Sequence, residues 1–328
     1  MREGHAKWRP PERLTLRGIA VLAFRRACRD MVRLADYSMV CGAHTFHVAM
    51  KSLGPLLICL ALFLMGFVAY TYLVHALPQM RASGLLVQCS LTSTGVFLLA
   101  NALYNYGLAV LTDPGLPPDF ERARAELEAE VEESSQPRPR QCRKCRRLKP
   151  PRSHHCSICN RCVLKMDHHC PWVNNCVGFR NYRHFCLFML FLAAACLFII
   201  AVVLHYFSDL VLHARRRAGG SRFARQCILA SFMLCCSIFV ALCVLGGFHA
   251  YLVLTNQTTI EFQSSFLRRP GAGKSGESRN PYDLGRSRNF QQVFGPSSLW
   301  HPGWMLPCLA LPPQGDGLHF PSFSQLRL

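Results

Sequence analysis

Seven cysteines and four histidines fall between Cys142 and Cys176, and most of them follow a pattern that repeats every 14 residues. Each copy reads Cys, two residues, Cys, nine residues, His, six residues, Cys. The two quartets are Cys142, Cys145, His155 and Cys162, and Cys156, Cys159, His169 and Cys176. Three thiolates and one imidazole are typical of tetrahedral structural zinc. The spacing therefore predicts two structural Zn²⁺ ions in one compact module, which has little apolar content and depends on metal to fold.

Cys170 belongs to neither quartet. It stands 14 residues after Cys156, but a third copy would need Cys at position 173 and His at position 183, where the chain has valine and arginine. A thiol beside His168 and Asp167 has the components of an activated nucleophile, because His168 can take the thiol proton and Asp167 can orient the ring. The alternative is that Cys170 is a spare ligand that exchanges with a neighbouring cysteine.

The composition indicates that this module is part of a membrane protein. Only 17% of residues are charged while 51% are hydrophobic, against about 25% charged in ordinary soluble domains. Four stretches without Asp, Glu, Lys or Arg exceed the ~20 residues that a membrane helix needs. These stretches are Gly54–Leu77, Leu85–Leu111, Phe185–Phe207 and Cys227–Thr255. We expect an all-α polytopic fold of four transmembrane helices, with the zinc module (142–184) between the second and third.

The second stretch is the least hydrophobic of the four. It carries glutamine, serine, threonine and asparagine side chains, which would have to face other helices or a cavity. The alternative is a buried helix of a soluble protein, for which 27 residues without a charge is long.

The distribution of basic residues predicts the orientation. Lys and Arg number 10 in residues 1–53, 14 in residues 112–184 and 7 in residues 256–328, against 6 in the two short loops. The positive-inside rule therefore puts the N-terminal segment, the central loop and the C-terminal tail in the cytosol. Five arginines in the loop Ser208–Gln226 oppose this orientation, whereas a reducing compartment suits free thiolates. Basic cytosolic loops also account for the net charge of +19 without nucleic acid.

Two flanking segments have charge patterns of their own. Arginines from Arg17 to Arg33 alternate with apolar residues, which predicts an amphipathic helix on an anionic leaflet. A mitochondrial presequence is the rival interpretation, and acidic residues among the first 36 positions oppose it. The acidic run Glu121–Glu133 has the pattern of a solvated helix or linker.

The cysteine-rich block also resembles a known family. Asp167-His168-His169-Cys170 in this setting is similar to the DHHC protein S-acyltransferases (palmitoyltransferases). Three shorter motifs match the family in order, over roughly Gly54–Gly295. They are Asp113-Pro114-Gly115, Thr258-Thr259-Ile260-Glu261, and Asn280-Pro281-Tyr282-Asp283 with Asn289-Phe290.

The resemblance implies a role at each matching position. Cys170 would accept the acyl chain, with His168 as general base, Asp167 as its orienting partner and His169 as a zinc ligand. Lys149, Arg152 and His154 match basic positions that face the phosphates of CoA, and Trp172 matches an aromatic residue that borders the acyl chain. The cosubstrate would be a fatty acyl-CoA such as palmitoyl-CoA. The acceptors would be cysteines of substrate proteins at the membrane, and relatives usually reside in the Golgi or endoplasmic reticulum.

The expected activity is a two-step acyl transfer through a thioester on Cys170, in a cavity among the four helices. A membrane-anchored zinc-finger adaptor without catalysis is the alternative, although it has no use for the thiol of Cys170. A transporter is disfavoured because the four stretches contain no Asp, Glu, Lys or Arg. The resemblance also implies that side chains of the first and third spans close the far end of the acyl cavity. In the third stretch, Ala193, Ala194 and Ala195 leave little bulk at that depth, so chains of 16 to 18 carbons are expected to fit. Close packing of two helices at these alanines is the alternative.

Overall fold

The computed structural model describes residues 49–122, 140–206, 222–267, 280–296, 302–305 and 312–322. From Lys51 onward these residues belong to one compact unit. The expected N-terminal amphipathic helix and nearly all of the acidic run Glu121–Glu133 lie outside the described residues. Most of the arginine-rich loop between the third and fourth stretches lies outside them as well.

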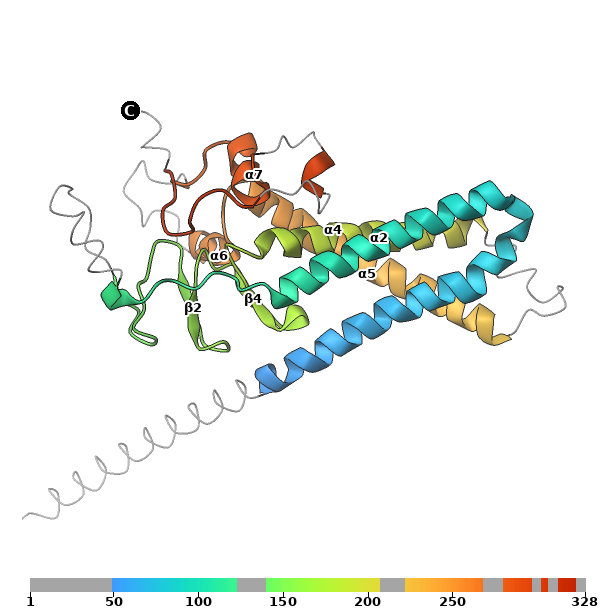
Figure 1. Ribbon diagram of the computed structural model, residues 1–328, viewed down its shortest axis with the longest axis horizontal. Helices are drawn as coiled ribbons and strands as arrows, with labels where there is room; N and C mark the ends of the chain where they lie inside the picture. Colours follow the sequence, from blue (N-terminus) through green and yellow to red (C-terminus); the bar gives the residue numbers. More distant parts are fainter. Residues whose placement is uncertain are drawn as a thin grey trace, which may run out of the picture. The chain divides into compact units, whose positions relative to one another are not determined.

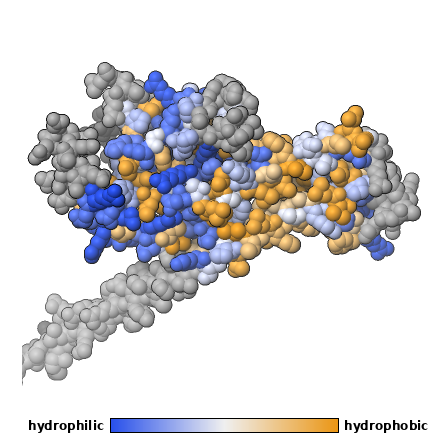
Figure 2. Space-filling view, viewed as in Figure 1, coloured by the Kyte–Doolittle hydropathy of each residue, from blue (hydrophilic) through white to orange (hydrophobic). Residues whose placement is uncertain are grey.

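Four described helices are long and apolar enough to cross a membrane. They are Ala49–Met80, α2 (Leu85–Leu111), α4 (Tyr182–His205) and α5 (Arg222–Leu254), and they run alongside one another in Figure 1. Figure 2 shows hydrophobic residues gathered over these helices and hydrophilic residues over the cysteine-rich and C-terminal end. So much exposed apolar surface is consistent with an integral membrane protein, because lipid can cover it.

The bounds of α2 agree with the sequence prediction, whereas the other three helices begin earlier than predicted. The first begins at Ala49, α4 at Tyr182 and α5 at Arg222. Charged side chains mark the edge of an apolar run rather than the end of a helix, because they can extend toward water while the backbone stays helical. The first span ends in a π-helical segment, Thr71–Ala76, followed by a 3₁₀ segment, Leu77–Ser83.

The polar side chains of α2 are accommodated in two ways. Asn101 and Asn105 are buried, and each side-chain amide donates to the carbonyl oxygen four residues earlier. These two agree with the expectation that polar groups face other helices. Ser93 is exposed instead, and its hydroxyl donates to the carbonyl of Cys89 at 2.7 Å. A hydroxyl bonded to its own helix does not require a partner on another helix.

The cysteine-rich region consists of two short antiparallel hairpins. The first pairs β1 (His154–Cys156) with β2 (Arg161–Val163), and the second pairs β3 (His168–Cys170) with β4 (Asn175–Val177). His155 lies opposite Cys162 in the first hairpin, as His169 lies opposite Cys176 in the second. The 14-residue repeat of the sequence is therefore also a structural repeat.

Buried asparagines join this region to the end of α2. Asn175 Nδ2 donates to the carbonyls of Ala109, Val110 and Thr112 at 2.9–3.3 Å. Asn181 Nδ2 also reaches the Ala109 carbonyl, at 3.3 Å. The last carbonyls of a helix have no partner within the helix, so these contacts satisfy the end of α2 and fix the second hairpin against it.

The segment Asp113-Pro114-Gly115 adds a second connection to the first hairpin region. Asp113 pairs with Arg161 at 2.8 Å, and the carbonyl of Gly115 accepts from the backbone N–H of Leu164. Gly115 has a φ of +109°, a conformation that side chains with a Cβ rarely adopt.

The C-terminal region closes over the end of α5. It contains α6 (Thr259–Leu267), α7 (Arg286–Phe294) and a 3₁₀ turn, Pro302–Met305. Asn289 donates its side-chain amide to the carbonyl of Leu254, the last residue of α5, and Asn280 donates to the carbonyl of Thr255, which follows it. The C-terminal asparagine motif thus acts as a cap that holds the tail against the fourth span.

Candidate active site

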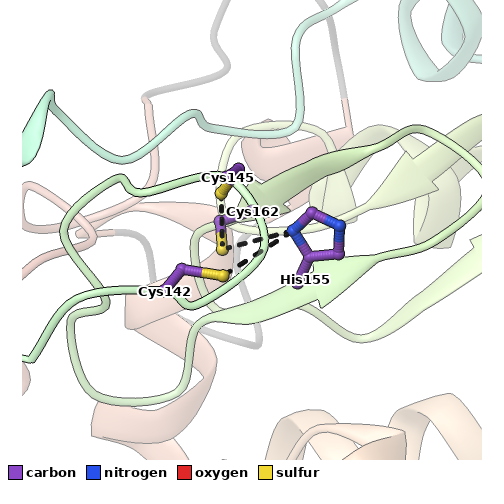
Figure 3. Close-up of side chains that lie close together, drawn as sticks. All are labelled: Cys142, Cys145, His155 and Cys162. Atoms are coloured by element: carbon purple, nitrogen blue, oxygen red, sulfur yellow. Dashed lines mark hydrogen bonds between the residues drawn. The ribbon is translucent and has the colours of Figure 1, made fainter.

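The structure brings the four side chains of the first quartet together. Cys145 Sγ lies 3.5 Å from Cys162 Sγ, while Cys142 Sγ and Cys162 Sγ lie 3.8 and 3.9 Å from His155 Nδ1 (Figure 3). Zinc bonds of ~2.3 Å to sulfur and ~2.0 Å to nitrogen place tetrahedral ligand atoms about 3.5–3.8 Å apart. The donor set and its spacing therefore fit one zinc ion.

The second quartet converges in the same way. Cys176 Sγ lies 3.5 Å from Cys159 Sγ, and His169 Nδ1 lies within 3.4–3.8 Å of all three sulfurs. The potential ligand atoms within each quartet lie within 4.8 Å of one another. Two Cys/His clusters that could hold zinc are thus present where the repeat predicts them.

Cys170 has the same position in the second hairpin as Cys156 has in the first, but it belongs to neither cluster. Cys156 lies opposite Arg161 at the end of β1, and Cys170 lies opposite Asn175 at the end of β3. Cys156 then becomes a ligand of the second cluster, whereas Cys170 leads into the turn Pro171–Val173. The thiol of Cys170 therefore lies outside both clusters.

His168 and Asp167 form a hydrogen-bonded pair next to Cys170. His168 Nδ1 lies 2.6 Å from Asp167 Oδ2, and Asp167 is almost fully buried. Thr259, at the start of α6, donates its backbone N–H and its hydroxyl to the same carboxylate at 2.9 and 2.7 Å. Burial raises the pKa of Asp167, but the bonds from His168 and Thr259 outweigh it and keep the carboxyl below its usual pKa.

The pKa values of His168 and Cys170 move in opposite directions. Burial alone lowers the pKa of His168, but hydrogen bonds to Asp167 and Cys170 raise it to about 9. Burial alone raises the pKa of Cys170, while the hydrogen bond and charge of His168 bring it below its ordinary value. A thiolate beside an imidazolium is the form of cysteine that attacks carbonyl carbon.

Several residues that surround His168 and Cys170 in the structure were not predicted from the sequence to lie there. The ring of His249, on α5, lies 5.8 Å from that of His168, and its Nδ1 lies 3.0 Å from the hydroxyl of Tyr182. The ring centroid of Phe185 lies 5.3 Å from that of His168 and 5.1 Å from that of His249. A histidine within an otherwise apolar span was the available signal for His249. Thr259 was noted only as part of a short motif, without a role.

A cavity of about 620 Å³ opens from Cys170 into the space among the four spans. Its mouth includes His168, Cys170 and Trp172, and its lining is almost entirely apolar. Its far end includes Tyr72, Gly95 and Phe198. The hydroxyl of Tyr106 donates to the Trp172 carbonyl at 2.8 Å and so holds the turn at the mouth. Such a cavity suits a long apolar chain joined to the thiol.

The three basic residues that the resemblance assigned to CoA, Lys149, Arg152 and His154, differ from one another in their exposure and contacts. Lys149 is exposed, and its charge lowers the pKa of His154 after the larger effect of burial. Arg152 is buried and makes a bidentate pair with Glu261 at 2.7 and 2.8 Å. Its other nitrogen contacts are with Asn256, and its guanidinium lies 4.4 Å over the ring of Tyr282. Arg152 thereby joins the cysteine-rich region to α6 and the tail.

Comparison with known proteins agrees with this geometry. Residues 135–265 match the family model described as DHHC palmitoyltransferase. The chain is 34% identical to "Probable protein S-acyltransferase 14" of Arabidopsis thaliana, over 87% of this chain and 96% of that protein. The chain belongs to the DHHC palmitoyltransferase family. It is also 36% identical to "Palmitoyltransferase ZDHHC20" of Homo sapiens, over 70% of this chain and 67% of that protein.

Membership in the DHHC palmitoyltransferase family identifies the activity class. The chain is a protein-cysteine S-palmitoyltransferase, a membrane enzyme with a zinc-binding cysteine-rich region. The resemblance drawn from Asp167-His168-His169-Cys170 is thereby confirmed at the level of the family.

Proposed function

We propose that this palmitoyltransferase transfers a long-chain acyl group from acyl-CoA to protein cysteines through a thioester on Cys170. One observation carries the proposal: the buried thiol of Cys170 lies at the mouth of an apolar cavity and beside the His168–Asp167 pair. A nucleophile, its base and a compartment for the acyl chain are thus combined at one point.

In the first step the thiolate of Cys170 attacks the thioester carbonyl of acyl-CoA. The bond between carbonyl carbon and CoA sulfur breaks, and the imidazolium of His168 gives its proton to the departing thiolate. In the second step His168 takes the proton of a substrate thiol, which attacks the acyl-enzyme carbonyl and releases Cys170. Asp167, held by Thr259, keeps the ring oriented in both steps.

The acyl chain occupies the cavity between the two steps, where the apolar lining excludes water from the thioester. Trp172 borders the mouth. Lys149, Arg152 and His154 face the phosphates of CoA, and Arg152 also pairs with Glu261 and Asn256. Two zinc ions would hold the two hairpins, the second of which carries His168 and Cys170. The ligands would be Cys142, Cys145, His155 and Cys162 in one site and Cys156, Cys159, His169 and Cys176 in the other.

The proposed arrangement in the membrane follows from the charges. Residues 1–53, 112–184 and 256–328 lie in the cytosol, and residues 54–111 and 185–255 contain the paired spans. The excess of Lys and Arg in the three cytosolic parts supports this orientation. The enzyme resides in an endomembrane, the Golgi or endoplasmic reticulum, and acts on proteins that present cysteines at that surface.

The test is acylation of the purified enzyme with labelled palmitoyl-CoA. We expect a hydroxylamine-labile adduct on wild type and none on Cys170→Ser, because a serine hydroxyl is far less nucleophilic at neutral pH. Cys89→Ser is the matched control, because Cys89 is an exposed cysteine on α2 outside both quartets and the cavity lining. An adduct of undiminished yield on Cys170→Ser would refute the acyl-enzyme.

A further inference from the structure

A second cavity, of about 530 Å³, shares no lining residue with the one that contains Cys170. Its walls come from the end of α2, through Tyr104, Asn105 and Leu108, and from the beginning of α4. Tail residues Met305, Pro312, Pro313 and Gly315 complete the lining. The proposed acyl transfer uses neither this cavity nor these tail residues.

The polar part of this cavity is basic. Arg180, Arg183 and His184 line it, and none of the described lining residues is acidic. Arg180 is exposed, whereas only 4% of Arg183 is exposed and its Nη2 donates to the carbonyl of Trp304 at 3.0 Å. The two arginine cations beside this hollow form a site where an anion gains electrostatic energy.

One of the two arginines lies at the beginning of a helix. Arg183 occupies the first turn of α4, which contains no acidic residue. The N-terminus of a helix carries a partial positive charge, so cations there are disfavoured and an anion is favoured. The helix end and the basic side chains therefore attract the same ligand.

The ligand must also have an apolar part and come from the membrane side. Leu108, Leu187 and Met305 line the cavity together with the basic groups. It lies where two membrane spans, α2 and α4, meet the cysteine-rich region, which is the level of lipid phosphates. Basic pockets between membrane helices on the cytosolic side bind phosphate head groups.

Aromatic contacts hold the tail over this cavity on both sides. Trp304 packs on Phe290 and Phe294 of α7, with ring centroids 5.2 and 4.9 Å apart. Phe320 packs on Phe179 and Tyr282, at 6.4 and 6.1 Å. The tail residues that contribute to the cavity thus belong to the packed structure.

We propose that this cavity binds the phosphate group of an anionic phospholipid, between α2, α4 and the C-terminal tail. The phosphate accepts hydrogen bonds from Arg180 and the hydroxyl of Tyr104 and pairs electrostatically with Arg183, while the glycerol and upper acyl carbons lie against Leu108 and Leu187. Acyl-CoA is the other source of phosphate at this surface. The structure favours lipid because the lining omits Cys170 and the rest of the acyl cavity.

The experiment measures retained lipid. Full-length protein is reconstituted in phosphatidylcholine nanodiscs containing phosphatidic acid, then extracted into detergent, and the bound phosphatidic acid is quantified by native mass spectrometry. Arg180→Gln is expected to reduce retention about fivefold, since one basic residue contributes about 1 kcal/mol to binding at an anionic lipid surface. Arg180→Glu is expected to reduce it further.

Arg288→Gln is the matched control, because it removes another exposed arginine, on α7, that does not line the cavity. The unfolding midpoint of each variant verifies that it is folded. Unchanged retention in both Arg180 variants, or equal loss in Arg288→Gln, would overturn the site. Displacement of phosphatidic acid by CoA without an acyl chain, lost in Arg180→Gln, would overturn the assignment to lipid and give the cavity to CoA.

Discussion

His168 and His169 are neighbours in the sequence but have different partners. Both belong to β3, and successive side chains of a strand point to opposite faces. His168 therefore reaches Asp167 at 2.6 Å, while His169 Nδ1 lies 3.4 Å from Cys159 Sγ. One face of a three-residue strand thus serves the proposed chemistry, and the other serves the proposed metal site.

This division predicts different losses for the two histidines. His168→Ala should slow formation of the acyl-enzyme by roughly 10²–10⁴-fold, the usual contribution of a general base, and leave close to two zinc ions per chain. His169→Ala should lose one zinc and unfold much of the block. Zinc content by elemental analysis and acylation rate are measured on the same preparations. The reverse pattern, with zinc lost only from His168→Ala, would exchange the two roles.

The pKa of Cys170 gives a pH-dependent test. A thiol whose pKa lies below the ordinary ~8.5 keeps more thiolate as the pH falls, so alkylation of wild type should persist at neutral pH. His168→Ala removes the hydrogen bond and positive charge that lower this pKa, and leaves the burial that raises it. The reactivity of that variant should therefore appear only at alkaline pH.

Iodoacetamide labelling followed by peptide mass spectrometry measures this profile between about pH 6 and 9, where thiols titrate. Quantifying the peptide that contains Cys170 separates it from the other cysteines, and Cys170→Ser provides the blank. If both proteins show the same midpoint, His168 does not lower the pKa of Cys170.

At the residue scale, spacing sufficed where ligands recur at fixed intervals and failed where the partners are distant in sequence. The 14-residue repeat assigned each thiol and imidazole of the clusters to the correct group. Thr259 lies 92 residues from Asp167, and only folding of the tail brings its hydroxyl to the carboxylate. His249 is similar, because its helix must pack against α4 before its ring nears that of His168.

At the scale of elements, the ion pair between Arg152 and Glu261 joins the cysteine-rich region to α6. The side chains of Arg152 and Glu261 are 1% and 24% exposed, and Glu261 also accepts from the backbone N–H of Thr258. Thr259, which binds Asp167, lies between Thr258 and Glu261 in the sequence. The pair therefore helps to hold the orienting hydroxyl at the active site.

Breaking this pair should reduce both stability and activity. Arg152→Gln leaves the Glu261 carboxylate without its cation and should cost about 3–5 kcal/mol, whereas the double variant Arg152→Met with Glu261→Met should cost less than the two single changes together. Arg161→Gln is the matched control, because its ion pair with Asp113 is 34% and 43% exposed and is worth about 1 kcal/mol or less. Denaturant unfolding and acylation rates measure these effects, and equal losses in Arg152→Gln and Arg161→Gln would contradict this role.

At the scale of the whole molecule, hydropathy predicted the number of spans but not the cavities that they enclose. The four apolar stretches match four described helices because ~20 apolar residues are sufficient signal. Which faces leave a gap depends on the sizes of side chains from all four helices, and no single stretch contains that information. The sequence therefore placed three alanines at one depth without specifying which of them faces the chain, and the structure puts Ala195 in the lining.

Ala195 is expected to determine how long an acyl chain the enzyme accepts. It lies ten residues beyond Phe185, or about 15 Å deeper at 1.5 Å per residue. The cavity continues past it to Phe198 and Gly95. Wild type should therefore accept chains of 16 to 18 carbons, with no sharp cut-off below 18. Ala195→Phe should place a ring across the cavity. In competition, the share of Cys170 acylated by longer chains should then fall, while the share acylated by 14-carbon chains should stay the same or rise.

Ala193→Phe separates the effect of the cavity wall from that of bulk alone. Ala193 lies on the same helix but lines a different hollow, together with Gly246 and Ala250 of α5. Small residues there can let helices pack closely, so a ring at this position should lower acylation equally for all chain lengths. The measurement is the distribution of acyl groups on Cys170 after exposure to an equimolar mixture of acyl-CoAs. Uniform loss in Ala195→Phe as well would show that Ala195 is a packing position, since a wall across the cavity can exclude only the chains long enough to reach it.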